Sequence, residues 1–306
     1  MSLIAASCEH DAESYTPGEQ APAGCQSMYF ATTKYVNTVE VEPEVKSFDI
    51  AIKRVDKSAA GTVNLSVVEN EGNVFVLPAT ASFAAGEETT SITVTYPTAK
   101  EGIKYALVLA VEGDNVSPYT NGYREVQYDL SILKWESIGT GYMLDGLVVR
   151  IFGVDPTIPL AVEIEKTTTA SGDRYRFDSP FASVATGKDE NGGYIGYPYN
   201  EPADVVPGIY KFVIDVTKDG LSLQPVSMGM DWGYGMFSCG SVYGYLSTNL
   251  GTYPLGTLKN NVMTFPVSSL YVSMTDFNDG GKYPCTTPTY IYLTAEAYLE
   301  SLKPAK

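Results

Sequence analysis

The sequence is poor in the residues on which many enzyme mechanisms and metal sites depend. It holds a single histidine, His10, so hydrolases that use a Ser-His-Asp or Cys-His arrangement are not expected, and neither are zinc sites built on histidine. Its four cysteines form no CxxC pair, and no GxxxxGK[ST] or GxGxxG fingerprint occurs. The sequence therefore predicts no metal, no cofactor and no bound nucleotide.

Positive charge and long apolar runs are also scarce. Lysine and arginine number 20 against 36 aspartates and glutamates, which gives a formal net charge of -16. A protein that binds nucleic acid needs lysine and arginine to displace the counterions of the phosphates, so nucleic acid is excluded as a partner. No run of about 18 apolar residues occurs, so no membrane-spanning helix is expected.

Glycine, proline and tyrosine are abundant, with 28, 18 and 23 copies, and this composition predicts an all-β protein rich in turns. Residues 28–133 show apolar side chains at every second position, as in strands with one buried face. Turn sequences such as ENEGN and AAGEE separate these strands. About seven short strands in about 105 residues predict an immunoglobulin-like sandwich. The alternating residues are Phe48, Ile50, Ile52, Val63, Leu65, Val67, Ile92, Val94, Tyr96, Tyr105, Leu107, Leu109, Val111, Val126, Tyr128, Leu130 and Ile132.

Residues 134–306 form a second β-rich domain, in which the pattern does not distinguish a sandwich from a closed meander or barrel. Strands are predicted at LVVRIF, LAVEIEK, RYRF, YKFVIDV, LSLQPVS, NVMTF and YIYL, with a tight turn at KDG. One helix is predicted in TAEAYLESLKP, with Thr294 as its N-cap and Leu299 and Leu302 on one side.

Residues 1–27 read as the end of a signal followed by a flexible tether. Ala5, Ala6 and Ser7 stand directly before Cys8, and a polar segment with proline and glycine follows. LIAASC resembles a bacterial lipobox, which implies lipidation at Cys8 and an exported protein anchored at the outer membrane or cell surface through its lipid alone. The alternative is an ordinary cysteine in a frayed terminus.

Two resemblances cover the rest of the chain. The run TVNLSVVENEGNVFVLPATASFAAGEETTSITVTY looks like a Calx-β module through Phe83, Gly86 and Glu87. The calcium site of such modules is not carried over, because the nearby acids are scattered. WESIGTGYMLDG and DRYRFDSPF are similar to a region of Bacteroidetes-type surface lipoproteins of unassigned function, some of which accompany glycan uptake. The matching residues are Trp135, Gly139, Asp145, Tyr175, Arg176, Pro180 and Phe181.

Clustered aromatic residues in the second domain are the candidate ligand site. Sugar rings stack their C–H faces on exposed aromatic rings, and glycine between such rings leaves them uncrowded. The same residues would also fit strands that bury tyrosine in a core. The candidates are Tyr194, Tyr197, Tyr199, Trp232, Tyr234, Tyr243 and Tyr245.

The sequence favours non-catalytic binding of extracellular carbohydrate. One alternative is an adhesin or surface-assembly subunit that binds a protein partner, and another is a glycoside hydrolase with two facing carboxylates. In an exported protein Cys239 and Cys285 could form a disulfide or remain two buried thiols.

Overall fold

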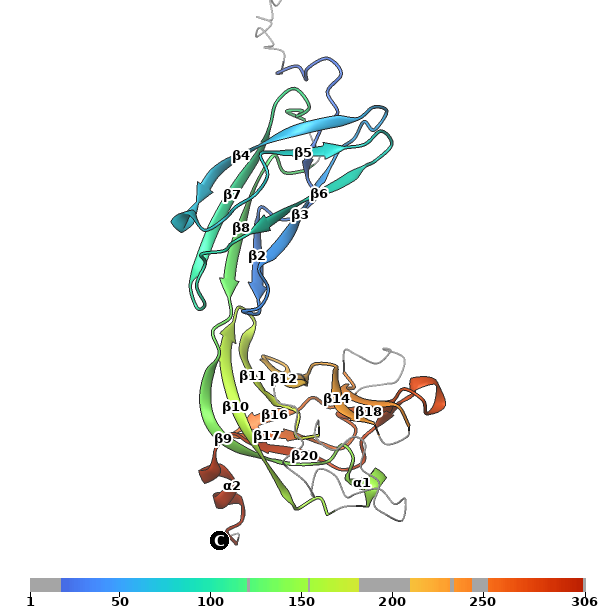
Figure 1. Ribbon diagram of the computed structural model, residues 1–306. Helices are drawn as coiled ribbons and strands as arrows, with labels where there is room; N and C mark the ends of the chain where they lie inside the picture. Colours follow the sequence, from blue (N-terminus) through green and yellow to red (C-terminus); the bar gives the residue numbers. More distant parts are fainter. Residues whose placement is uncertain are drawn as a thin grey trace, which may run out of the picture. The chain divides into compact units, whose positions relative to one another are not determined.

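A computed structural model describes residues 18–119, 122–153, 155–181, 210–231, 234–243 and 253–304. The chain divides into two compact units, Met1–Ile132 and Leu133–Lys306, each with its own hydrophobic core. Both units are built from strands, so the fold is all-β (Figure 1). In the described residues no helix has the length and apolar character needed to cross a bilayer.

The N-terminal unit consists of a three-stranded sheet, in the order β1-β3-β6, and a five-stranded sheet, in the order β2-β8-β7-β4-β5. Every pairing is antiparallel except that of β2 with β8, which is parallel. The two sheets enclose one core, so this unit is a sandwich. Its strands are β1 (Tyr29–Phe30), β2 (Val36–Val41), β3 (Ser47–Lys53), β4 (Gly61–Asn70), β5 (Thr80–Phe83), β6 (Thr89–Thr95), β7 (Lys104–Glu112) and β8 (Glu125–Ile132), with a 3-10 turn η1 (Glu71–Asn73).

The alternation predicted for this unit is confirmed for most of its strands, and the core includes Ile50, Ile92, Leu109 and Leu130. The prediction is wrong at Val67, which is exposed. A bulge between Val67 and Glu69 shifts the register of β4 against β7. Val67 still pairs in register with Leu109, and the bulge begins directly after it, so the regular alternation ends at this point of β4.

A fully buried arginine, Arg54, donates hydrogen bonds to the AAGEE turn of the run that resembles a Calx-β module and to neighbouring segments. Its guanidinium donates to the carbonyl oxygens of Ala59 and Ala84, both at 2.6 Å, and to Gln26 Oε1 at 2.8 Å. Its Nε donates to the carbonyl of Glu87 at 2.7 Å. The cation therefore satisfies four acceptors in this region.

The C-terminal unit contains an eight-stranded antiparallel sheet in the order β13-β12-β11-β10-β9-β20-β17-β16. The strands β9 and β10 are long and strongly curved (Figure 1). The bounds are β9 (Glu136–Leu144), β10 (Pro159–Thr169), β11 (Gly172–Asp178), β12 (Lys211–Thr217), β13 (Gly220–Leu223), β16 (Thr257–Lys259), β17 (Val262–Phe265) and β20 (Thr289–Tyr292).

This sheet closes on itself through a bridge between Leu221 and Gly256. The amide of Leu221 donates to the carbonyl of Gly256 at 2.8 Å, and the amide of Gly256 donates back at 3.3 Å. A Cβ at Gly256 would lie 2.8 Å from the ring of Phe265, so the close approach requires glycine. Of the two architectures that the pattern left open, the structure has the closed meander.

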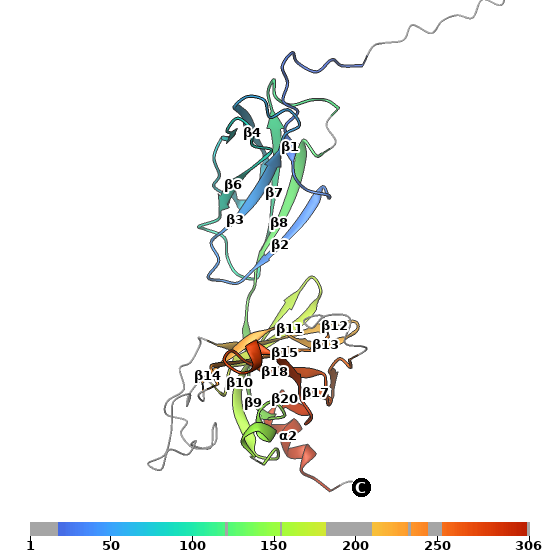
Figure 2. The ribbon, with the colours of Figure 1, turned by 90° about the vertical axis from the view of Figure 1, so that its right-hand side faces the viewer.

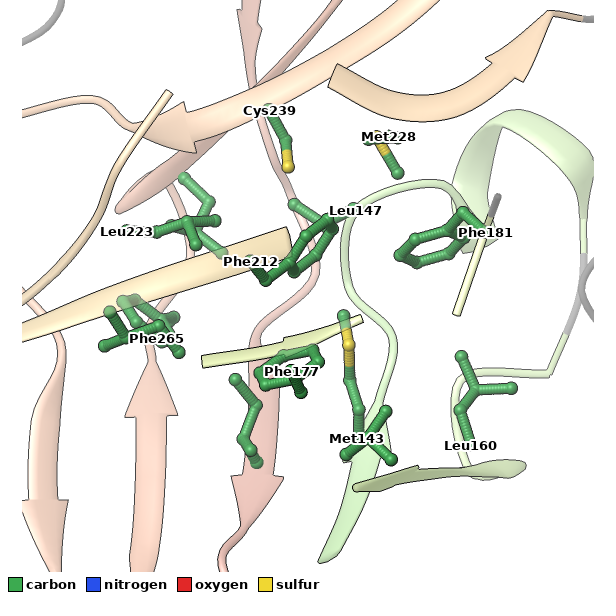
Figure 3. Close-up of a cluster of buried hydrophobic side chains, with 14 of the residues drawn as sticks. Met143, Leu147, Leu160, Phe177, Phe181, Phe212, Leu223, Met228, Cys239 and Phe265 are labelled. Carbon is green, nitrogen blue, oxygen red and sulfur yellow. The ribbon is translucent and has the colours of Figure 1, made fainter. Parts of the chain in front are cut away.

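A four-stranded sheet in the order β14-β15-β18-β19 packs on the barrel and shares its core. Figure 3 shows side chains of both sheets in this core, among them Phe265 of the barrel and Cys239 of the smaller sheet. An eight-stranded barrel is just wide enough to be filled by side chains. The void inside, beside Phe212 and Phe265, is about 10 Å³ and holds no ligand-sized space. The added strands are β14 (Val226–Asp231), β15 (Met236–Ser241), β18 (Leu270–Met274) and β19 (Lys282–Pro284).

The strand predicted at residues 147–152 is wrong, because this segment forms the helical turn α1 (Val149–Phe152). Asp145 Oδ1 accepts from the amides of Leu147 at 2.6 Å and Val148 at 3.3 Å, which starts the turn. Gly153, at φ 67°, ends it in the left-handed conformation. Leu147 and Val148 still enter the core and Phe152 packs against it, but from a turn, and Ile151 is exposed.

The helix predicted near the C-terminus is confirmed as α2 (Ala295–Ser301). Thr294 is its N-cap, and its hydroxyl oxygen accepts from the amide of Ala297 at 3.2 Å. The side of α2 that meets the barrel carries Tyr298, whose ring lies 4.7 Å from that of Tyr142. Leu299 and Leu302 are exposed. In both views α2 lies on the outside of the barrel (Figures 1 and 2).

Candidate functional site

A groove lies between the turn α1 and the neighbouring edge of the four-stranded sheet. It consists of two hollows of about 370 Å³ and 320 Å³, a size typical of small-molecule sites. Ile151, Met274 and Phe277 line both hollows, so the two are adjacent. We call this feature the aromatic groove, because three aromatic rings follow its length.

The rings of Tyr234, Phe277 and Tyr283 form a row. Tyr234 and Phe277 meet edge to face, with centroids 5.9 Å apart, and Phe277 and Tyr283 are separated by the same distance. Tyr234 lines the smaller hollow, Tyr283 lines the larger one, and Phe277 lines both. Tyr234 and Phe277 are 40% and 43% exposed, so a ligand can reach their faces.

Backbone bonds at the end of β18 hold this row in place. The amide of Asp276 donates to the carbonyl of Tyr234 at 2.9 Å, which joins the two loops that carry the rings. The turn η4 (Asn278–Gly280) follows, and Asn278, Asp279 and Gly280 all have positive φ. Asn278 Nδ2 donates to the hydroxyl of Tyr283 at 2.7 Å. The loop is thus a formed structure that presents Phe277.

One charged side chain lines the larger hollow. Arg150, on α1, is exposed, and its guanidinium donates to the hydroxyl of Thr286 at 2.8 Å. No aspartate or glutamate of the described chain lines either hollow. The described part of the groove therefore offers aromatic faces, aliphatic walls and one cation, and it contributes no pair of facing carboxylates of the kind that a glycosidase requires.

Asp145 is completely buried just before the wall segment that begins at Gly146. Its Oδ1 starts the turn α1, while its Oδ2 has no hydrogen-bond partner. Burial raises the pKa of this carboxyl to about 7, against the opposing effect of the backbone amides of Leu147 and Val148. Asp145 thus changes its charge near neutral pH.

The structure places two of the seven predicted aromatic residues. Tyr234 lines the aromatic groove, whereas Tyr243 follows the other end of β15 and is 56% exposed. The six residues of β15 separate them by about 20 Å, so they cannot belong to one small site. Cys8, Tyr194, Tyr197, Tyr199, Trp232 and Tyr245 lie outside the described residues.

Cys239 and Cys285 are free, buried thiols. Cys239 of β15 lies opposite Val272 of β18 in the sheet. On the other side of β18, the amide of Cys285 donates to the carbonyl of Leu270. Two strands that flank a third lie about 9.6 Å apart, whereas a disulfide needs Cα atoms within about 7 Å. The structure therefore has the two buried thiols, and the suggested disulfide is absent. Burial raises the pKa of both, that of Cys285 to about 12.

The residues that carried the second resemblance serve the fold. The guanidinium of Arg176 lies 4.0 Å from the centroid of the Trp135 ring. Gly139, at φ 96°, lies at the bulge of β9 against β10. Tyr175 and Phe181 are buried in the core, so neither is available to a ligand.

Phe277, Tyr283 and Arg150 were not identified as site residues from the sequence. Arg150 lies in the segment LVVRIF, which the sequence predicts to be a strand, and Phe277 lies in DFNDGG, outside the aromatic clusters that gave the candidate residues. The signal that could have found Phe277 is an aromatic residue directly before a glycine-rich turn, because such a turn leaves the ring uncovered.

No protein-family model matches the chain, and no curated protein matches it. Solved structures with weak similarity include a protein of unknown function from Bacteroides ovatus, 12% identical, with 87% of this chain and 89% of that chain covered at a TM-score of 0.31. A multidomain protein including DUF1735 from Bacteroides ovatus is 12% identical, covers 86% of this chain and 94% of its own, and has a TM-score of 0.28.

The apo form of the Calx CBD1 domain is 15% identical and has a TM-score of 0.27, with 35% of this chain and 96% of that domain covered. A Calx-β-type domain and Bacteroides proteins, one of them of unknown function, are thus both among the similar structures. At these values the likeness supports no inference about what the chain does.

Proposed function

We propose that the protein binds carbohydrate without cleaving it, and that the aromatic groove is the binding site. The observation that carries this proposal is the row of Tyr234, Phe277 and Tyr283 beside a hollow of sugar size. A sugar ring has an apolar face of C–H groups, which an exposed aromatic ring covers at little entropic cost. The Thr286 and Tyr283 hydroxyls and Arg150 supply polar groups at the same groove.

Tyrosine at this site also orients a ligand. The Tyr283 hydroxyl accepts a hydrogen bond from Asn278, so its own proton is free to point to an acceptor in the groove. Phe277 supplies a face without a polar group. A sugar that stacks on Phe277 can therefore be held at one edge by Tyr283, which fixes its direction along the groove.

We further propose that the protein is a cell-envelope lipoprotein, anchored through Cys8. The support is the order of small residues before that cysteine and the polar, proline- and glycine-containing segment after it. The test is metabolic labelling with an alkyne fatty acid in a bacterial host that processes lipoproteins. Label in the parent that is absent from Cys8→Ala supports the anchor, and equal labelling of both overturns it.

A protein partner is the second candidate, because the walls of the groove are largely apolar. Ile151, Met274 and Phe277 form its centre, and Ile151 is 41% exposed. Exposed apolar groups of this kind also suit a peptide side chain. The two candidate functions therefore share Phe277 as a contact residue and differ in the ligand that binds it, a sugar ring in one case and a peptide side chain in the other.

The test of the proposed function is a glycan-array screen of the chain beside the double variant Tyr234→Ala with Phe277→Ala. Tyr119→Ala is the matched control, since Tyr119 is an exposed tyrosine of the N-terminal unit. Binding by the parent and the control that is lost in the folded double variant supports the proposal. Binding to no glycan, or equal binding by all three proteins, overturns it.

A further inference from the structure

We propose that the carbohydrate is acidic and that Arg150 pairs with its carboxylate or sulfate group. This inference rests on the carbohydrate binding proposed above and names the class of sugar. Arg150 is the one charged side chain among the described residues that line the larger hollow. The chain has a net charge of -16, so its overall field repels an anion, and an anionic ligand needs a local cation such as Arg150 to offset that field.

Arg150 differs from the other arginines of its unit in having no carboxylate partner among the described residues. Arg174 pairs with Asp215 at 2.6 Å, and Arg176 pairs with Glu165 at 2.6 Å. Arg150 instead donates one bond to the neutral hydroxyl of Thr286. That bond fixes the guanidinium at the edge of the hollow without neutralising its charge.

The geometry of the guanidinium fits an oxyanion. The bond to Thr286 uses one donor of Nη1, and the remaining donors of the planar fork can meet two oxygens side by side. Carboxylate and sulfate both present such a pair of oxygens. Lysine carries the same charge but lacks the fork, so it would replace this contact only in part.

The described titratable groups that line the larger hollow or lie directly behind its wall carry little negative charge below neutral pH. Cys285 lines the hollow, and burial raises the pKa of its thiol to about 12, so it is neutral. Asp145, behind the wall, is largely protonated below pH 7, and Cys239 is a buried neutral thiol. Asp276 and Asp279, beside Phe277 on its loop, line neither hollow.

The test compares polymers that differ only in charge. Polygalacturonate and its fully methyl-esterified form share one ring, and dextran sulfate and dextran share another. Affinities are measured by biolayer interferometry at pH 6.5 for the parent, Arg150→Gln, Arg150→Lys and Arg124→Gln, an exposed arginine of the N-terminal unit. The parent is expected to bind one of the acidic polymers at least about tenfold more tightly than its neutral counterpart. Tighter binding of polygalacturonate would identify a carboxylate as the partner of Arg150, and tighter binding of dextran sulfate would identify a sulfate.

Arg150→Gln is expected to remove this preference and leave the affinity for the neutral polymer unchanged, with Arg150→Lys in between and Arg124→Gln equal to the parent. High salt should weaken the parent but not Arg150→Gln. Equal affinity of the parent for charged and neutral polymers, with both lost in the Tyr234 and Phe277 double variant, overturns this inference and leaves the proposed function standing. Binding of no polymer and no arrayed glycan overturns both.

Discussion

The ring of Tyr234 meets the ring of Phe277 edge to face, with centroids 5.9 Å apart and planes at 87°. The two residues belong to separate loops, and the bond from the Asp276 amide to the Tyr234 carbonyl joins those loops. An edge-to-face pair is a favourable arrangement of two aromatic quadrupoles. The pair thus presents a fixed aromatic surface, and binding need not order it first.

Phe277→Ala is expected to weaken glycan binding at least about tenfold, because the main stacking face is removed. This corresponds to about 1.4 kcal/mol of binding free energy. The side chain is 43% exposed, so the fold should tolerate the change. Isothermal titration with a glycan identified on the array gives the affinity. Tyr243→Ala, at the far end of β15, is the control, and an equal loss in that variant would contradict the placement of the site.

Asp145→Asn is expected to change how the stability of the C-terminal unit depends on pH. The pKa of Asp145 is raised to about 7 in the folded state from 3.8, so the folded chain holds a proton that the unfolded chain loses between these values. Stability contributed by this group is therefore present below about pH 4 and falls as pH rises to 7. The loss is on the order of 4 kcal/mol, at 1.36 kcal/mol per pKa unit.

Asparagine keeps the acceptor that starts the turn α1 and cannot ionise. The free energy of unfolding of the variant minus that of the parent should therefore increase from pH 4.5 to pH 8, as measured by urea denaturation. Asp173→Asn is the matched control: the pKa of Asp173 is lowered from 3.8, mainly by its hydrogen bond with Lys166, so this carboxyl is ionised in both states above pH 4.5 and its removal should give a difference that is nearly constant with pH. A difference for Asp145→Asn that is constant with pH would sink this account.

Arg54→Ala is expected to destabilise the N-terminal unit by about 3 kcal/mol or more, because four acceptors lose their donor in a buried place. Arg54→Lys should cost less but remain clearly destabilising, since lysine cannot reach all four with one planar group. Denaturant unfolding followed by fluorescence and circular dichroism measures both. Lys46→Ala is the exposed control, and stability equal to that of the parent in Arg54→Ala would show that the buried arginine is dispensable.

Cys239 and Cys285 are expected to remain unreactive in the folded protein and to react as thiols once it is unfolded without reductant. Their burial and raised pKa values keep them from the thiolate form. Maleimide labelling of the folded and of the unfolded protein, read out by intact mass, measures this reactivity. Labelling of the half-buried Cys25 in the folded protein would show that the reagent is active. A mass lower by two hydrogens, with no labelling of this pair after unfolding, would reveal the disulfide that the strand positions exclude.

Much of the fold could be predicted from the sequence, because the patterns concerned are local. The alternation around Ile50 and Leu109, the turn at KDG and the N-cap at Thr294 each depend on a few neighbouring residues. The bulge at Val67 and the turn α1 could not be predicted. The bulge after Val67 depends on how β4 pairs with β7, and α1 depends on a buried Asp145 that overrides the β-propensity of LVVRIF.

The aromatic groove was beyond prediction for a similar reason. Tyr234 was a candidate because it lies in a stretch rich in tyrosine and glycine, but its partners Phe277 and Tyr283 come from a segment more than 40 positions further on. Only the pairing of β15 with β18 brings the two loops together. Phe237 belongs to the same aromatic-rich stretch but is buried in the core, with its ring centroid 5.9 Å from that of Phe152. Aromatic density alone therefore does not tell a ligand-binding ring from a core ring.

Saturation-transfer difference NMR tests the central claim most directly, because it detects which protons of a ligand touch protein rings. The aromatic protons of the protein are irradiated in the presence of a glycan found on the array. The account predicts strong transfer to the C–H protons of one sugar face, and loss of that transfer in the variant with Tyr234→Ala and Phe277→Ala. Unchanged transfer in that variant would contradict the assignment of the aromatic groove as the binding site.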